Sequence, residues 1–86
     1  MKYTPCEHVD WKPFDDESVV LDLTSGYYFR LNRVGTFIWP LLDGRHGLTD
    51  IVNRVIDRFA VSQRQAKRDV GDFIGQLLAE NLIQKA

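Results

Sequence analysis

The chain has 86 residues, enough for one domain and too few for two, so we expect a single domain over residues 1–86. Hydrophobic residues make up 44% and charged residues 27%, and the net charge of −1 gives no general attraction to nucleic acid or to an anionic membrane. One cysteine, Cys6, excludes an internal disulfide, and no apolar run approaches the roughly 20 residues of a membrane span. Residues 1–10 lack the apolar stretch of a signal peptide, so we expect a cytoplasmic protein.

The first half of the sequence has the alternating pattern of β-strands. Residues 19–24 (VVLDLT) alternate apolar and polar side chains, and residues 27–31 (YYFRL) alternate again with an aromatic bias. An earlier strand is expected around residues 6–11, and Pro13 is expected to end it. The acidic run at residues 15–17 then predicts a solvated turn.

The pairing register of the hairpin at residues 19–31 is predicted from how each possible register distributes apolar and polar residues over the two faces. A two-residue loop would mix apolar and polar residues on each face, whereas a three-residue loop with Gly26 in a left-handed bulge gathers six large apolar residues on one face. The predicted pairs are Leu23 with Tyr27, Leu21 with Phe29, and Val19 with Leu31. The opposite face then carries Val20, Asp22, Tyr28 and Arg30.

The second half has the apolar spacing of three helices. Asn32 is a favourable N-cap for the first, at about residues 33–42, which Pro40 is expected to kink or shorten. Thr49 is expected to cap the second helix, and Ser62 opens the third with a capping box. The third helix is expected to reach about residue 81. The apolar stripes of the second and third helices are Leu48, Ile51, Val52, Val55, Ile56 and Phe59, and then Ala66, Val70, Phe73, Ile74, Leu77 and Leu78.

This order of elements predicts an α+β, winged-helix-like fold: a three-stranded antiparallel β-meander followed by three α-helices. Leu82 and Ile83, which follow the third helix, are expected to fold back on the core. An antiparallel sheet of three strands has two open edges, and open edges are places where another strand can add.

Catalytic and metal sites find little support in the sequence. There is no Ser/His/Asp arrangement and no Gly-rich phosphate loop. Cys6 and His8, with His46 far away, fall short of the four ligands of a structural zinc site. The carboxylates at residues 15–17 fit a solvated turn better than a cation or acid–base site. We therefore expect no enzyme activity, no metal and no cofactor.

Nucleic-acid binding is an alternative from another class. The second and third helices, joined by a tight turn, resemble a helix-turn-helix, and Arg64, Lys67 and Arg68 could contact phosphates. Acidic residues share the third helix, and the slightly acidic chain lacks the basic footprint of a DNA reader. A further alternative is a structural subunit that pairs with itself through the open edge.

The segment at residues 27–31, beside the third helix, favours peptide binding. It carries none of the Lys or Pro residues that usually protect a sheet edge, so an extended peptide can add there as another strand. Gly71 and Gly75, one turn apart, are expected to leave a shallow channel beside Ile74 and Leu78, and close packing without a ligand is the alternative. The predicted peptide-binding residues are Tyr27, Tyr28, Phe29, Arg30, Leu31, Arg64, Lys67, Arg68, Gly71, Ile74, Gly75 and Leu78.

Residues 19–44, VVLDLTSGYYFRLNRVGTFIWPLLDG, resemble the PqqD-like family, also called the RiPP recognition element. The matching features are Leu21-Asp22-Leu23, Gly26, Tyr28-x-x-Leu31-Asn32, Gly35, Ile38-Trp39 and Leu41-Leu42-Asp43-Gly44. The similarity continues through Ile51-Val52, Phe59, Asp69-Val70, Phe73, Leu77-Leu78 and Leu82-Ile83, so that it covers about residues 6–83. Pro40 departs from the family pattern and leaves the length of the first helix open.

The resemblance implies a protein that binds the leader segment of a ribosomally synthesised precursor peptide. The leader is expected to add antiparallel to the third strand, residues 27–31, and to lie against the third helix from Arg64 to Leu78. A chain of 86 residues is expected to be a freestanding member, monomeric or weakly dimeric, that presents the precursor to a separate enzyme.

Two pathways follow from the resemblance. A hydrophobic channel with a basic mouth suits an acidic leader with aromatic anchors, which favours a lasso-peptide pathway with a leader protease and a cyclase. The alternative partner is a radical SAM enzyme, as in pyrroloquinoline quinone synthesis.

Overall fold

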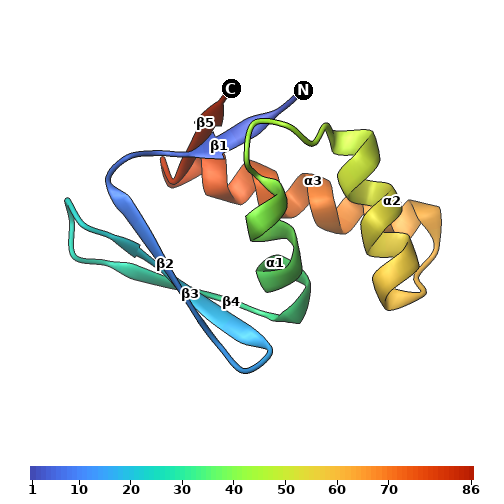
Figure 1. Cartoon of the computed structure of the whole chain (residues 1–86), viewed down its shortest axis with the longest axis horizontal. Helices are drawn as coiled ribbons and strands as arrows, with labels where there is room; N and C mark the ends of the chain where they lie inside the picture. The colour runs from blue at the N-terminus through green and yellow to red at the C-terminus, as the bar shows by residue number, and fades with distance from the viewer.

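The computed structural model describes residues 1–86, and its α+β arrangement confirms the predicted fold class (Figure 1). A three-stranded antiparallel sheet precedes three helices, and a second sheet of two short strands joins the ends of the chain. The strands are β1 (Tyr3–Pro5), β2 (Val9–Phe14), β3 (Glu17–Asp22), β4 (Tyr28–Leu31) and β5 (Ile83–Lys85). The helices are α1 (Arg33–Ile38), the short 3₁₀ helix η1 (Trp39–Leu41), α2 (Leu48–Phe59) and α3 (Gln63–Ala79). None of these helices is long and apolar enough to cross a membrane.

The two-stranded sheet holds the chain ends together. β1 pairs antiparallel with β5, which places Tyr3 opposite Lys85 (Figure 1). Leu82 and Ile83 are 0% and 3% exposed, which confirms that they fold back on the core. The sequence did not indicate the two strands, because three residues are too few to establish an alternating pattern.

β2 continues through Pro13, so the prediction that this residue ends the strand was wrong. β2 is an edge strand, and Pro13 lies opposite Ser18. The amide of Leu23 donates to the carbonyl of His8 at 2.8 Å, so the odd-numbered residues of β3 bond to β2. Pro13 pairs with an even-numbered residue, and its nitrogen therefore faces the open edge, where no donor is required.

The loop between β3 and β4 has four residues, not three. The amide of Asp22 donates to the carbonyl of Tyr27 at 2.9 Å, and the amide of Gly26, at φ +82°, donates to the carbonyl of Asp22 at 2.8 Å. The Asp22 carboxylate accepts bonds from the amides of Thr24 and Ser25. Burial acts to raise the pKa of Asp22, but these two bonds, together with the Ser25 side chain and the charge of His8, outweigh it and lower the pKa. The side chain of Asp22 thus fixes the loop length.

The longer loop shifts the register by one residue, so the predicted pairing and the predicted faces of β3 were wrong. The observed pairs are Ser18 with Leu31, Val19 with Arg30, Val20 with Phe29 and Leu21 with Tyr28. Val20 and Ser18 are buried, whereas Val19 and Leu21 lie on the other face. The buried Ser18 hydroxyl is satisfied by Thr36 Oγ1 at 2.8 Å. On β4 the predicted faces are confirmed.

Two predicted helix starts are confirmed. Asn32 Oδ1 accepts a bond from the amide of Gly35 at 2.9 Å, so Asn32 caps α1 directly after β4. Ser62 Oγ accepts a bond from the amide of Gln65 at 3.1 Å. Pro40 lies at the start of η1, so it shortens the first helix as expected.

Two other helix ends differ from the prediction. The N-cap of α2 is Gly47, whose backbone is extended, and Thr49 lies inside the first turn. α3 ends at Ala79 rather than near Asn81, which has a left-handed φ of 58°. These shifts of one or two residues leave the helix order unchanged.

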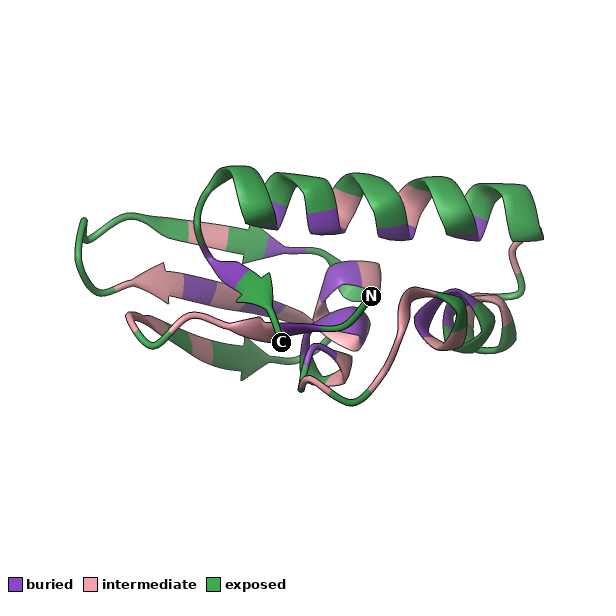
Figure 2. Cartoon of the chain, turned by 90° about the horizontal axis from the view of Figure 1, so that it is seen from above, coloured by how far each residue is buried: buried purple, intermediate pink, exposed green.

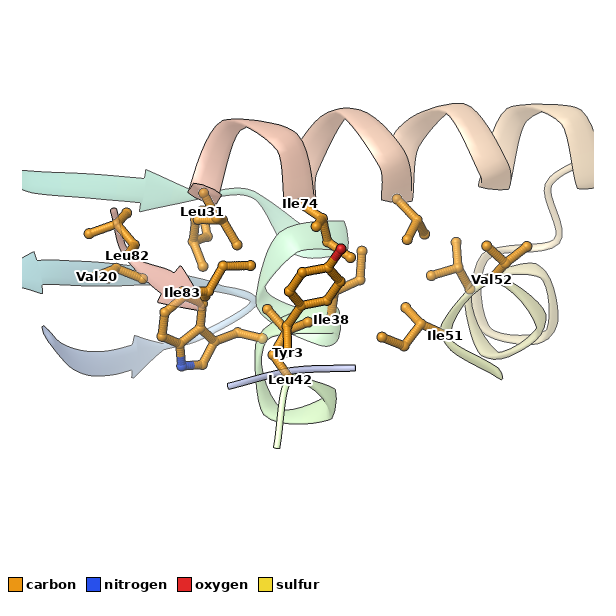
Figure 3. Packing of buried hydrophobic residues seen from close by; sticks show 14 of the residues in the cluster. Tyr3, Val20, Leu31, Ile38, Leu42, Ile51, Val52, Ile74, Leu82 and Ile83 are labelled. Carbon is orange, nitrogen blue, oxygen red and sulfur yellow. The ribbon is translucent and has the colours of Figure 1, made fainter. Parts of the chain in front are cut away.

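A cluster of 15 buried residues joins the sheet to the helices. The buried residues of α3 face the rest of the molecule, and its opposite side is exposed (Figure 2). Val20, Leu31, Leu82 and Ile83 lie together near the C-terminal end of α3 (Figure 3). This packing fixes β4 beside the second half of α3.

Candidate functional site

A groove of about 400 Å³ lies between β4 and the C-terminal half of α3. On one side it is lined by residues 28–32, and on the α3 side by Phe73, Gln76, Leu77 and Glu80. Leu82 also lines it and, like Leu31 and Leu77, is buried, so these three leucines form an apolar bottom.

The groove continues past the C-terminal end of β4. A second hollow of about 290 Å³ shares Asn32, Phe73 and Gln76 with the first and adds Val34, Gly35, Asp69 and Asp72. The two hollows form one channel along α3, which we call the β4–α3 groove.

One wall of this groove is a sheet edge without a partner strand. β4 pairs only with β3. The amide of Asp22 bonds to the carbonyl of Tyr27, so every second residue of β4, counted from Tyr27, makes its backbone hydrogen bonds to β3. Phe29 therefore directs its N–H and C=O toward β3, whereas Tyr28 and Arg30 direct theirs toward the open edge. The edge of β2 carries Pro13, but β4 carries neither proline nor lysine. The groove thus has free hydrogen-bonding groups along one side.

Gly35 allows the aromatic ring of Phe73 to lie close to α1. A Cβ at this position would meet Phe73 Cε1 at 3.0 Å and Leu31 Cβ at 3.3 Å. Because Phe73 lines both hollows, the missing side chain at position 35 sets how far the ring projects into the groove.

The α3 wall of the groove is acidic. Asp69, Asp72 and Glu80 line it, and none of the three takes part in an ion pair. The cation in the lining, Arg30, bonds to Glu17 at 2.8 Å. The predicted basic mouth is therefore absent from this groove.

The structure brings together the predicted residues of β4 but not those of α3. Tyr28, Phe29, Arg30 and Leu31 line the groove, and Tyr27 precedes the strand and is 73% exposed. Ile74 is buried in the core. Lys67 and Gly71 line a separate hollow of about 280 Å³ against α2. The other four predicted residues of α3 are exposed and line none of these three hollows: Arg64, Arg68, Gly75 and Leu78.

The predicted residues of α3 lie away from this groove for a geometric reason. The apolar stripe identifies the buried face of a helix, but it has two flanks, and the pattern does not say which flank meets β4. The flank with Lys67 and Gly71 faces α2. The opposite flank faces the start of α1 at Asp69 and both α1 and β4 at Gln76. Phe73 and Leu77 were in the predicted stripe without being assigned to the site.

A second polar arrangement lies away from the groove, where the loop after η1 meets α2. His46 Nδ1 lies 2.9 Å from Asp43 Oδ1, and its Nε2 lies 3.8 Å from Asp50 Oδ2. The bond with His46 and the amide of Arg45 lower the pKa of Asp43 from 3.8 to about 2. No group of three or more His, Cys, Asp or Glu side chains is arranged to hold a metal ion.

Asp43→Asn is expected to change how stability depends on pH. A depressed pKa means that ionised Asp43 stabilises the folded state above pH ~4, and this contribution is lost as the pH falls toward about 2. In urea titrations, the difference in unfolding free energy between the wild type and the variant should shrink from pH 5 to pH 2. A difference that stays constant over this range would contradict the assignment.

Comparisons with known proteins identify a family and two similar structures. A family model described as coenzyme PQQ synthesis protein D (PqqD) matches residues 17–83. The solved structure of TbiB1 in complex with the TbiA(beta) leader peptide has a TM-score of 0.86 and 31% identity, and the match covers 96% of each chain. A lasso peptide synthetase B1 complexed with the leader peptide has the same fold, with a TM-score of 0.87 and 21% identity over 98% of this chain and 99% of that one. No curated protein matches significantly.

Proposed function

The chain belongs to the family of coenzyme PQQ synthesis protein D, and from this membership we propose that it binds the leader segment of a ribosomally synthesised precursor peptide without catalysing a reaction itself. The observation that carries the proposal is that the edge of β4 has no partner strand and lies beside a groove with an apolar bottom. The leader-peptide complex of TbiB1, a protein 31% identical to this chain, supports it.

The guest peptide adds as a strand to the edge of β4. The free N–H and C=O groups of Tyr28 and Arg30 supply the main-chain hydrogen bonds. An antiparallel guest is favoured, since every strand pair in this sheet is antiparallel and such pairing is slightly more stable per residue. Alternate guest side chains then point over Phe73, Leu77 and Leu82.

The contacts on α3 come from the flank that meets β4. We assign guest contact to Phe73, Gln76 and Leu77, in place of the predicted Arg64, Lys67, Arg68, Gly71, Ile74, Gly75 and Leu78. The walls of the groove belong to packed elements, so the site is formed before the guest arrives. The ordering of a disordered guest still costs about 2–5 kcal/mol, which is consistent with moderate affinity.

The bound precursor is presented to a separate maturation enzyme. A leader protease and a cyclase of a lasso-peptide pathway are our first choice, because both similar structures come from leader-peptide complexes and one is described as a lasso peptide synthetase B1. The argument from a basic mouth no longer contributes, since the cations of α3 lie away from the groove. A radical SAM enzyme is the alternative, and the family membership supports it.

A salt titration separates peptide binding from DNA binding. We expect fluorescently labelled leader peptides, taken from short reading frames beside the gene and from TbiA(beta), to bind with affinities that change only a few-fold between 50 and 200 mM salt. A duplex DNA contact through several phosphates would lose about 10³-fold or more over the same range. Tight, steeply salt-dependent DNA binding without binding of any leader peptide would overturn the proposal.

Gly35→Ala is expected to weaken peptide binding while the fold survives. The added methyl group pushes the Phe73 ring toward the groove, where it takes space that the guest side chains need, so affinity should fall about tenfold. The crowding also costs the fold about 1–3 kcal/mol of stability. Gly75→Ala is the control, because nothing lies within 4 Å of its added Cβ. It should leave affinity unchanged and raise stability by up to ~1 kcal/mol. Equal affinities of the two variants, measured by calorimetry, would place the site elsewhere.

A further inference from the structure

Three carboxylates line the β4–α3 groove without a cationic partner. The six ion pairs of the chain engage the acidic residues Asp10, Asp16, Glu17, Asp43 and Asp50. Asp69, Asp72 and Glu80 take no part in them, although α3 also carries three cations. Those cations, Arg64, Lys67 and Arg68, line neither part of the groove.

The negative charge is concentrated at one end of the groove. Asp69 and Asp72 line the part beyond Asn32, past the C-terminal end of β4. Asp69 is half-buried, and its Oδ1 accepts a bond from Gln65 at 2.8 Å, which holds the carboxylate in place and leaves Oδ2 free. The lining of this part contains no lysine, arginine or histidine. A guest side chain with positive charge would therefore meet two uncompensated acceptors.

On the basis of the proposed function, we infer that the groove selects leader peptides whose flank beyond the C-terminal end of β4 is basic. An antiparallel guest places its N-terminal flank at this end. In the selected peptide, Lys or Arg residues therefore lie on the N-terminal side of the apolar residues that fill the groove over Phe73 and Leu82. This differs from the expectation of an acidic leader, which assumed that the cations of α3 lie at the mouth of the channel; they line neither part of the groove.

Selection from a displayed library of random peptides, about 16 residues long, tests the inference. Peptides enriched on the wild type should carry Lys or Arg on the N-terminal side of their apolar residues. Enrichment on the double variant Asp69→Asn, Asp72→Asn should keep the apolar residues and lose the basic ones. Asp57→Asn, on an exposed position of α2 outside the groove, is the matched control and should select the same peptides as the wild type.

The affinity of one enriched peptide then measures the charge contribution. Replacing its basic residues by glutamine should weaken binding to the wild type about tenfold and leave binding to the double variant unchanged. Enriched peptides without a basic flank, or the same basic preference on the double variant, would overturn the inference and leave peptide binding intact. No enrichment on any variant, each shown to be folded by circular dichroism, would overturn the proposed function itself.

Discussion

Replacing Arg30 by proline is expected to weaken peptide binding about 30-fold or more, whereas replacing it by alanine leaves binding largely intact. Both substitutions remove the exposed ion pair with Glu17, which contributes at most about 1 kcal/mol to stability. Only proline removes the amide that faces the open edge and puts a ring in the path of the guest backbone. The guest then loses one hydrogen bond and keeps an unsatisfied carbonyl, which together cost ~2 kcal/mol or more, roughly 30-fold in affinity.

The fold should tolerate proline at this position. Arg30 lies opposite Val19 in a pair that makes no hydrogen bonds across to β3, so the ladder is kept. Its predecessor, Phe29, is already extended, as a residue before proline prefers. Calorimetric titration of both variants, with circular dichroism as a check on folding, measures the difference. Equal affinities for proline and alanine would rule out strand addition at Arg30.

Leu82→Ala is expected to destabilise the protein by about 2–5 kcal/mol. Leu82 is fully buried where the sheet meets α3, beside Val20, Leu31 and Ile83 (Figure 3), and it also lines the groove. Truncation removes apolar contacts and leaves a cavity, since the surrounding strands and helix are fixed by their own packing.

The matched control for this substitution is Leu78→Ala. Leu78 is only four residues away but 37% exposed, so its truncation should cost about 1 kcal/mol or less. Unfolding in urea, followed by tryptophan fluorescence and circular dichroism, gives both free energies. If the two variants lost equal stability, the packing of Leu82 in the structure would be incorrect.

Local chemistry made much of the fold predictable. Asn32 and Ser62 cap their helices because a short polar side chain can satisfy a free amide of the first turn. Pro40 shortens the first helix because it lacks an amide proton. The open edge at residues 28–31 follows from the order of three consecutive strands, which leaves the last one without a second partner.

The errors arise where a single side chain determines the strand register, or where tertiary packing determines which face of a helix lines the groove. A count of apolar residues per face favoured the wrong register, because it did not include the Asp22 carboxylate that holds the longer loop or the Thr36 hydroxyl that satisfies a buried Ser18. The acidic side of the groove was missed because the packing of α3 against α2 decides which flank of α3 turns toward β4. This packing leaves Lys67 and Gly71 in the hollow beside α2.

Hydrogen exchange at individual amides tests the addition of a guest strand most directly. With a labelled protein and a bound leader peptide, the amides of Tyr28 and Arg30 should become strongly protected, because they face the open edge and gain partners. The amide of Phe29, already directed toward β3, should change much less. Binding that left the exchange of Tyr28 and Arg30 unchanged would contradict the account.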